Sequence, residues 1–187
     1  MLNNRQAVVI GGSAGSIPVL NTIIAALPKL FPLPVIVCVH RMKNVAEGIK
    51  EVFELNANCA LFEPNDKEPI LPGNIYIAPS NYHLLIGSDK TFSLSTDRLV
   101  NYSRPAIDLT FQTAAKVYKS GLIGILLTGA NKDGAHGMLA VKNNGGTTIV
   151  QDPEECSAPF MPAAALALKC VDYIFTERKI ISFLLEK

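Results

Sequence analysis

Residues 7–20 read AVVIGGSAGSIPVL and combine a strand, a glycine-rich turn and the start of a helix. Ala7–Ile10 is a short run rich in β-branched residues, which is typical of a buried strand. From Ser16 to Leu27 the apolar residues recur at helical spacing, and Ser16 is a suitable N-cap. A buried strand that leads straight into a helix is how crossover units of a parallel sheet begin.

The same alternation continues along the chain. Further strands are predicted at Pro34–Val39, Asn74–Ala78, Leu122–Leu127, Thr147–Val150 and Tyr173–Phe175. Further helices are predicted at Val45–Phe53, from Pro105 to about Tyr118, and at Gly134–Asn144, Pro162–Leu168 and Glu177–Leu185. Between them, His83–Ile86 and Thr91–Leu94 flank a turn and predict a β-hairpin. The pattern indicates an α/β protein: a mostly parallel sheet with helices on both faces and an antiparallel hairpin.

Composition narrows the class of protein. The 187 residues are enough for one domain, and neither a linker nor a repeat divides them, so we expect a single domain over residues 1–187. Hydrophobic residues make up 49% and charged residues 18%, which excludes a disordered chain. A net charge of +1 provides no general attraction for nucleic acid or anionic membranes.

The remaining signals concern location and metals. The chain has no apolar run of ~18 residues, as a spanning helix requires, and its N-terminus does not resemble a signal peptide, so we expect a cytoplasmic protein without membrane insertion. The cysteines are scattered and have no metal-ligand spacing, so we expect no metal or cofactor and mostly buried, reduced thiols. They are Cys38, Cys59, Cys156 and Cys170.

Three chemically active side chains follow predicted strands. Ser13 follows the first strand, His40 the second, and Asp133 lies in the loop after Leu122–Leu127. Ligand sites of parallel sheets lie beyond the carboxyl ends of the strands, so these side chains are expected at one edge. A hydroxyl nucleophile needs a base such as histidine, and a carboxylate orients that base. The pattern favours a serine-type hydrolase.

Small residues around these positions suit the same chemistry. Glycines beside Ser13 allow a sharp strand-to-helix turn. The backbone N–H groups of Ala14 and Ala130 are candidates for binding an oxyanion. Each residue also has a structural explanation, since Ser13 and Asp133 can cap helices and His40 can be a hydrogen-bonded histidine at a strand end. Taken singly, none of the three identifies a function.

Other motifs are weaker. The pattern G-x-G-x-x-G fails because Ile10 stands where its first glycine belongs, and the chain has no G-K-[ST], so nucleotide binding is disfavoured. Cys38 shares a strand face with His40, but a thiol in an apolar strand is more often part of the core. His83 is expected to anchor the hairpin, with contact to substrate as an alternative, and His136 is expected to be exposed. Arg104 could reach a carboxylate, but a surface ion pair is the commoner role of such a residue.

The residues in these positions resemble the catalytic domain of chemotaxis-type protein-glutamate methylesterases (CheB-type). The resemblance runs in order through AVVIGGSAGS (7–16), VIVCVH (35–40), LPGNIYIAPSNYHL (71–84), SRPAID (103–108), LLTGANKDGAHGM (126–138) and residues 151–162. It implies a three-layer α/β fold with Ser13 as nucleophile, His40 as base, Asp133 as the orienting acid and oxyanion contacts near Ala14 and Ala130. It also implies hydrolysis of glutamate methyl esters on the cytoplasmic helices of chemoreceptors, with release of methanol.

The chain departs from the family pattern in three ways. Ser16 stands where a second glycine is usual, and Arg41-Met42-Lys43 replaces the usual apolar residue and proline after the histidine. The receiver domain that commonly precedes this domain is absent from the sequence, so we expect a stand-alone domain that is constitutively active or controlled by a separate regulatory protein. Some relatives deamidate receptor glutamines, which leaves that activity open. The alternatives are a non-catalytic binding module of the same fold and a small-molecule carboxylesterase.

Overall fold

The centre of the protein is a parallel β-sheet. The structure, a computed structural model, describes residues 4–40 and 48–186. Within these residues the sheet has seven strands, and every neighbouring pair runs parallel, in the order β3-β4-β2-β1-β7-β8-β9. The strands are β1 (Ala7–Gly12), β2 (Val35–Val39), β3 (Ala60–Phe62), β4 (Asn74–Ile77), β7 (Leu122–Leu126), β8 (Thr147–Gln151) and β9 (Tyr173–Phe175).

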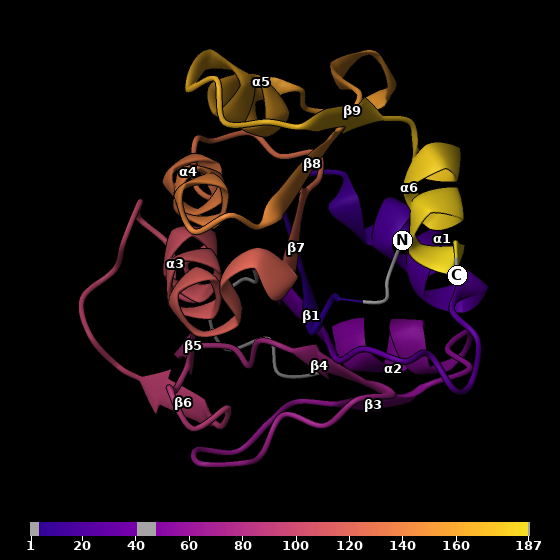
Figure 1. Ribbon diagram of the computed structural model, residues 1–187, viewed down its shortest axis with the longest axis vertical. Coiled ribbons are helices and arrows are strands. Elements are labelled where there is room, and N and C mark those ends of the chain that lie inside the picture. The colour runs from indigo at the N-terminus through magenta and orange to yellow at the C-terminus, as the bar shows by residue number, and fades with distance from the viewer. Residues whose placement is uncertain (1–3, 41–47, 187) are drawn as a thin grey trace.

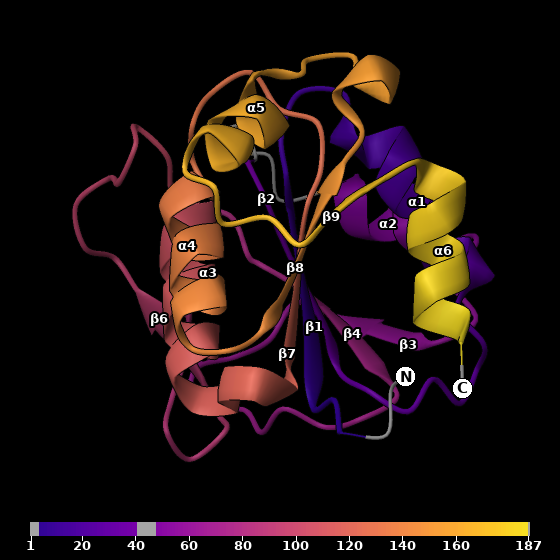
Figure 2. The same ribbon diagram turned by 45° about the horizontal axis from the view of Figure 1, so that its top comes forward.

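Helices cover both faces of this sheet (Figures 1 and 2). One side holds α3 (Ile107–Tyr118), α4 (Ala135–Asn143) and α5 (Phe160–Ala167), and the other holds α1 (Ser16–Ala26), α2 (Ile49–Glu54) and α6 (Glu177–Leu185). Two short 3₁₀ helices, η1 (Lys119–Gly121) and η2 (Pro153–Glu155), lie in the connections. In the described part of the chain, no helix is long and apolar enough to cross a membrane. The predicted three-layer α/β arrangement is confirmed.

The strand side chains point alternately to the two faces of the sheet, so the protein has a hydrophobic core on each face. In β1, Ala7 and Val9 pack with the α3 and α4 side, whereas Val8 and Ile10 pack with α1. All four side chains are fully buried, because successive residues of a strand point to opposite faces and both faces are covered. This explains why the strand sequence is a continuous apolar run instead of an alternation of apolar and polar residues.

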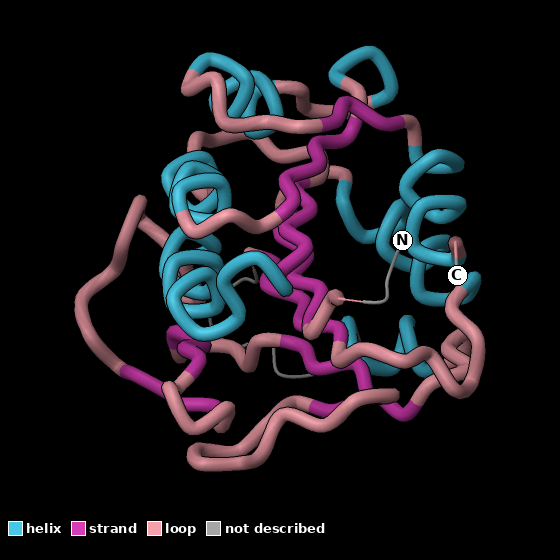
Figure 3. Tube along the Cα trace, in the orientation of Figure 1, coloured by secondary structure: helices cyan, strands magenta, loops and turns pink. Residues whose placement is uncertain are grey.

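The predicted hairpin lies outside the main sheet. Strands β5 (His83–Ile86) and β6 (Phe92–Ser95) pair antiparallel with each other and form a two-stranded sheet of their own, labelled near α3 in Figure 1 and drawn as magenta segments of the tube in Figure 3. The hairpin packs against α3, and Thr113 of that helix accepts a hydrogen bond at Oγ1 from the N–H of Ile86, at 3.1 Å. The hairpin therefore supports the helix whose first turn enters the site described below.

One strand was missed, and several element boundaries differ from the predictions by one or two residues. Strand β3 was not predicted, because its three residues are too short to show a period. Helix α3 begins at Ile107 and not at Pro105, since Ala106 still has an extended backbone. Helix α5 begins at Phe160, before the predicted Pro162, and β1 runs on to Gly12. The described part of α2 is Ile49–Glu54, and residues 45–47 of the predicted helix lie outside the described residues.

Gly11 determines how closely α3 approaches the end of β1. A Cβ at this position would lie 2.5 Å from Cγ2 of Ile107 and 2.7 Å from Cε2 of Phe111, which is closer than side-chain atoms pack. Only glycine therefore allows the first turn of α3 to rest against β1. This contact brings the backbone N–H groups at the start of α3 toward the carboxyl end of the sheet.

All four cysteines lie in the described part of the chain and are free thiols, as expected. Cys38, Cys59 and Cys170 are buried, and Cys156 is half-buried. Burial raises the pKa of Cys38 to about 12, against the lowering effect of a hydrogen bond with Thr110, so this thiol stays protonated. Cys38 is a core residue.

Candidate active site

Three neighbouring strands bring the predicted side chains together. The register pairs Gly12 of β1 with Val39 of β2, so Ser13 and His40, one residue further on, leave the sheet side by side. The backbone N–H of Ser13 donates to the carbonyl of Thr128, which follows β7, at 2.9 Å. The central order β2-β1-β7 thus places the turn after β1 between the other two.

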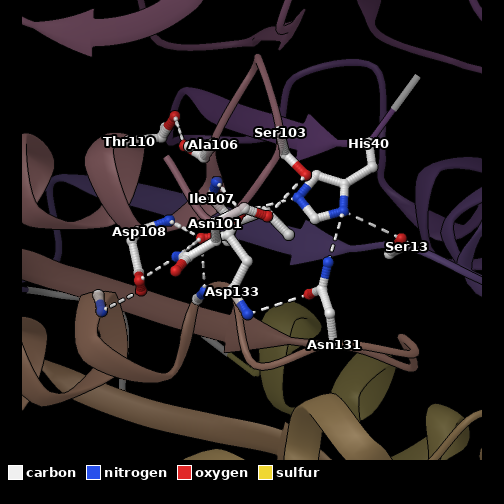
Figure 4. Close-up of polar contacts among 12 residues, drawn as sticks. Ser13, His40, Asn101, Ser103, Ala106, Ile107, Asp108, Thr110, Asn131 and Asp133 are labelled. Atoms are coloured by element: carbon white, nitrogen blue, oxygen red, sulfur yellow. Dashed lines mark hydrogen bonds and ion pairs between the residues drawn. The ribbon is translucent and has the colours of Figure 1, made fainter. Parts of the chain in front are cut away.

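The side chains form a continuous hydrogen-bonded chain (Figure 4). His40 Nδ1 lies 3.1 Å from Ser13 Oγ, and His40 Nε2 lies 2.7 Å from Asp133 Oδ2. An ionised carboxylate only accepts hydrogen bonds, so Nε2 carries the imidazole proton and Nδ1 is the acceptor for the Ser13 hydroxyl. A proton can move from Ser13 to His40 while Asp133 stabilises the imidazolium.

Asn131 also faces the imidazole of His40. It was not among the site residues predicted from the sequence. Its Oδ1 accepts a hydrogen bond from the backbone N–H of Asp133 at 3.0 Å, which turns its amide nitrogen toward His40. That nitrogen lies 3.5 Å from His40 Nδ1. A donor facing Nδ1 agrees with Nδ1 being the unprotonated nitrogen. Asn131 stands two residues before Asp133 in the same strand-end loop, so its position was readable from the sequence.

Asp133 is fully buried and saturated with donors. Its Oδ2 accepts from the N–H of Ile107 at 2.7 Å as well as from His40, and its Oδ1 accepts from the N–H of Asp108 at 3.1 Å and from the Asn101 amide at 2.8 Å. Burial raises the pKa of Asp133, but hydrogen bonds from His40, Asn101 and the two backbone N–H groups outweigh it and leave the pKa below its usual range. Asp133 is held ionised.

A second buried carboxylate shares one of these donors. The Asn101 amide also donates to Asp108 Oδ2 at 2.8 Å, and the N–H of Gly137 donates to Asp108 Oδ1 at 2.7 Å. Burial raises the pKa of Asp108, and the nearby charge of Asp133 adds to that, although both hydrogen bonds oppose them. Asn101 and Asp108 were also missed by the sequence analysis, since Asn101 lies 32 residues from Asp133.

The caps at this edge differ from the predictions. Helix α1 has Gly15 as its N-cap, with φ 78°, and Ser16 is its first residue; the Ser16 hydroxyl donates to the carbonyl of Ser13 at 2.7 Å. Helix α4 has Gly134 as its N-cap, with φ 93°. Asp133 instead accepts hydrogen bonds from the first turn of α3, where a negative charge is also favoured by the helix dipole.

The two backbone N–H groups proposed for an oxyanion belong to exposed residues. Among residues 4–40 and 48–186, neither the Ala14 N–H nor the Ala130 N–H has an acceptor. Thr128 holds the turn that carries Ala14, because its hydroxyl donates to the Ala14 carbonyl at 3.0 Å. Both N–H groups are therefore available to donate hydrogen bonds to a substrate oxygen.

The weaker sequence candidates lie elsewhere or have structural roles. His83 is fully buried between the Arg98 carbonyl, 3.0 Å from Nε2, and the Ala106 N–H, 3.2 Å from Nδ1, so it anchors the loop before α3. Among the residues that the structure describes, Arg104 has no ion-pair partner; its guanidinium donates to the carbonyls of Thr96 and Asp97. His136 is exposed, as expected. The segment Arg41-Met42-Lys43 lies outside the described residues.

Known proteins match this chain over nearly its whole length. Residues 8–184 match the family model described as CheB methylesterase. A protein from Leptospira interrogans, provisionally named a protein-glutamate methylesterase/protein-glutamine glutaminase, is 44% identical over 177 residues, which cover 95% of this chain and 92% of that protein. A Thermotoga maritima protein named protein-glutamate methylesterase/protein-glutamine glutaminase is 36% identical over 184 residues, which cover 97% of this chain and 54% of that protein.

A solved structure shows the same architecture. The crystal structure of the Thermotoga maritima CheB methylesterase catalytic domain matches with a TM-score of 0.92 at 36% sequence identity. The match covers 96% of this chain and 97% of that domain. The chain therefore corresponds to a catalytic domain over nearly its whole length, although it spans only about half of the full-length Thermotoga relative.

Proposed function

The chain belongs to the CheB methylesterase family, and from that premise we propose that Ser13, His40 and Asp133 carry out its protein-glutamate methylesterase activity. The observation that carries the proposal is the hydrogen-bonded chain from Asp133 through His40 Nε2 and Nδ1 to Ser13 Oγ, at 2.7 and 3.1 Å. These contacts are within the reach that proton transfer requires. Residues 1–187 act as one catalytic domain in this proposal.

The first half of the reaction forms an acyl-enzyme. Ser13 Oγ attacks the carbonyl carbon of the glutamate γ-methyl ester while His40 Nδ1 takes the hydroxyl proton. Asp133, held ionised by its donors, stabilises the imidazolium through Nε2. When the C–OCH₃ bond breaks, His40 returns the proton to the methoxide oxygen, and methanol leaves. Ser13 then carries the glutamyl group as an ester.

The negative charge that develops on the carbonyl oxygen needs donors during each attack. The N–H groups of Ala14 and Ala130 supply them in this proposal, because both belong to exposed residues in the loops after the neighbouring strands β1 and β7. Backbone donors are already oriented by the fold, so they stabilise the oxyanion without reorganising during the reaction. Removal of one oxyanion donor typically lowers kcat by ~10²-fold or more.

The second half hydrolyses the acyl-enzyme. His40 Nδ1 takes a proton from a water molecule, the resulting hydroxide adds to the acyl carbon, and the proton passes to Ser13 Oγ as it leaves. The sum is ester plus water giving glutamate carboxylic acid, which ionises, plus methanol. The same steps on a glutamine amide release ammonia, and glutaminase activity is therefore a second reaction of the same residues, in keeping with the names of the relatives.

The natural substrate in this proposal is a protein. CheB methylesterases act on methylated chemoreceptors, and we propose that the cytoplasmic domain of such a receptor is the substrate of this chain as well. Because the receptor presents its methylated glutamates in the cytoplasm, the proposal also assigns this chain to that compartment. A general esterase of small molecules would hydrolyse aryl esters in preference to a methylated receptor.

Replacement of the nucleophile tests the proposal directly. In Ser13→Ala, release of methanol from a methylated receptor fragment is expected to fall by ~10³-fold or more, because no hydroxyl remains to form the acyl-enzyme. A phosphonofluoridate probe is expected to label the wild type and not Ser13→Ala. Ser182→Ala on α6, an exposed serine away from the site, serves as the matched control. Turnover by Ser13→Ala at the wild-type rate contradicts the proposal.

A further inference from the structure

The loop that enters α3, residues 96–106, is tied down along its whole length; we name it the rim loop. At its start, the Arg104 guanidinium donates to the carbonyls of Thr96 and Asp97, the latter at 2.8 Å. His83 Nε2 lies 3.0 Å from the Arg98 carbonyl, and the Ala106 N–H donates to His83 Nδ1. In Figure 1 this loop projects outward between β6 and α3. Its projection is therefore a fixed shape held by side chains.

The tip of the rim loop is a tight turn fastened to the active site. Val100 and Ser103 pair antiparallel, with N–H to carbonyl distances of 3.2 and 2.9 Å, so Asn101 and Tyr102 form the two turn residues. The Asn101 amide donates to the carboxylates of Asp133 and Asp108, both at 2.8 Å. Tyr102 is thus one peptide bond away from a residue that contacts the carboxylate of the proton relay.

Tyr102 has an unusual backbone for its side chain. Its φ is 62° and that of Asn101 is 49°, both in the left-handed region that two-residue hairpin turns require. Asparagine tolerates this region, and the contacts of Asn101 explain its presence, but an aromatic residue is disfavoured there. Tyr102 is also 98% exposed, so contacts within the described protein do not offset the strain. Strained residues that persist beside an active site are commonly functional.

We propose that Tyr102 is a specificity residue through which the enzyme recognises the surface of a protein substrate. The inference rests on the proposed function, because a methylated glutamate that belongs to a folded protein brings the surrounding surface against the rim of the site when its carbonyl reaches Ser13. An exposed aromatic ring carried by a fastened turn contributes a large contact area, and its few rotatable bonds keep the loss of side-chain entropy on binding small. Leu99 of the same loop is also exposed, at 43%. A small ester brings no surrounding protein surface, so its reaction at Ser13 is expected not to depend on either side chain.

Substitution of Tyr102 by glycine separates recognition from folding. Glycine adopts φ 62° without strain, so Tyr102→Gly is expected to melt at or above the wild-type temperature. Its KM for a methylated receptor fragment is expected to rise about tenfold, which is the size of loss for one well-packed aromatic at an interface. The kcat for that fragment, and kcat/KM for N-acetylglutamate γ-methyl ester, are expected to stay within about twofold of wild type, as the proton relay is intact. Tyr102→Phe is expected to keep the low KM, because the ring remains.

Two control variants test where these effects come from. Lys169→Gly makes the same change of backbone at φ 53° beyond the end of α5, and Leu30→Ala removes an 87% exposed apolar side chain between α1 and β2. Neither is expected to change KM for the receptor fragment. Binding of the fragment to Ser13→Ala, with and without Tyr102→Gly, measures the same contact without turnover and is expected to weaken by a similar factor.

The outcomes separate the two proposals. An unchanged KM and an unchanged affinity in Tyr102→Gly contradict the role of Tyr102, and so does an equal loss of kcat/KM on the receptor fragment and on the small ester, which indicates damage to the relay. A wild-type enzyme that releases no methanol from the receptor fragment contradicts the proposed function itself. If the small ester reacts too slowly, the rate of phosphonofluoridate labelling replaces it as the measure of an intact relay.

Discussion

The turns after β1 and β7 have a similar backbone arrangement, but their functional side chains differ in burial. Each follows a central parallel strand, and each leads into a helix whose N-cap is a glycine with positive φ, 78° at Gly15 and 93° at Gly134. In the first turn Ser13 is half-buried and Ala14 is exposed, whereas in the second Asp133 is fully buried. Two similar turns therefore leave Ala14 exposed to solvent and bury Asp133.

The difference reflects what each side chain must do. A nucleophile has to meet a substrate, so few contacts of Ser13 are available to stabilise the fold. A buried carboxylate is costly unless donors surround it, and Asp133 receives hydrogen bonds from His40, Asn101 and the start of α3. We infer that the Asp133 side chain contributes to stability as well as to catalysis, while the Ser13 side chain contributes to catalysis and little to stability.

The largest expected effect is on the free energy of unfolding. Asp133→Ala is expected to lower it by about 3 kcal/mol or more, because Asn101 and the N–H groups of Ile107 and Asp108 lose an acceptor inside the protein. Ser13→Ala is expected to change it by less than about 0.5 kcal/mol, although both variants lose activity. Urea unfolding of the two variants beside wild type measures the contrast. Equal losses of stability would remove the distinction between the turns.

A smaller effect is expected from Asn101, which connects the enclosed turn to the rim loop. Asn101→Ala removes the donor that Asp133 and Asp108 share, so we expect a loss of about 1–3 kcal/mol in unfolding free energy and roughly a tenfold lower kcat, as Asp133 orients His40 less firmly. Asn144→Ala, which removes a hydrogen bond to the Ala140 carbonyl at the end of α4, is the control for activity. A fully active Asn101→Ala would show that backbone donors alone position Asp133.

The smallest expected effect is the pH dependence of stability. The pKa of Asp133 is lower in the fold than in the unfolded chain, so its ionised form favours folding above its ordinary pKa of ~4, and this contribution is lost as pH falls through the folded value. The stability difference between wild type and Asp133→Ala is expected to be constant near neutral pH and to shrink below about pH 4. Denaturant unfolding as a function of pH measures it.

Asp108 is expected to give stability a pH dependence of the opposite sign to that of Asp133. Its pKa is raised by burial, so the fold favours the protonated form, and this contribution to stability is present below the ordinary pKa and is lost as pH rises through the folded value. Relative to wild type, Asp108→Asn is therefore expected to gain stability as pH rises through that range. A shared pH dependence in the Asp133 and Asp108 variants would contradict the opposite shifts of the two carboxylates.

Much of the fold was readable because its signals are local. Short apolar runs predicted six of the seven strands described in the parallel sheet, and the helical spacing predicted the helices between them, since burial on both faces of a parallel sheet leaves a direct imprint on the sequence. Strand β3 and the start of α3 were missed, where three residues show no period and where Ala106 remains extended before the helix. The residues Ser13, His40 and Asp133 were found together because carboxyl ends of neighbouring parallel strands share an edge.

The sequence by itself therefore determined the order of strands and helices and the side chains that stand at the edge of the sheet. Only the tertiary structure decided which donors hold Asp133, which nitrogen of His40 faces Ser13, and that Tyr102 stands exposed at the end of a fastened turn. The physical reason is that these properties depend on backbone N–H groups and on close contacts such as that of Gly11 with Ile107, between segments far apart in the chain. Every residue except proline has a backbone N–H, so its partner leaves no mark on the sequence.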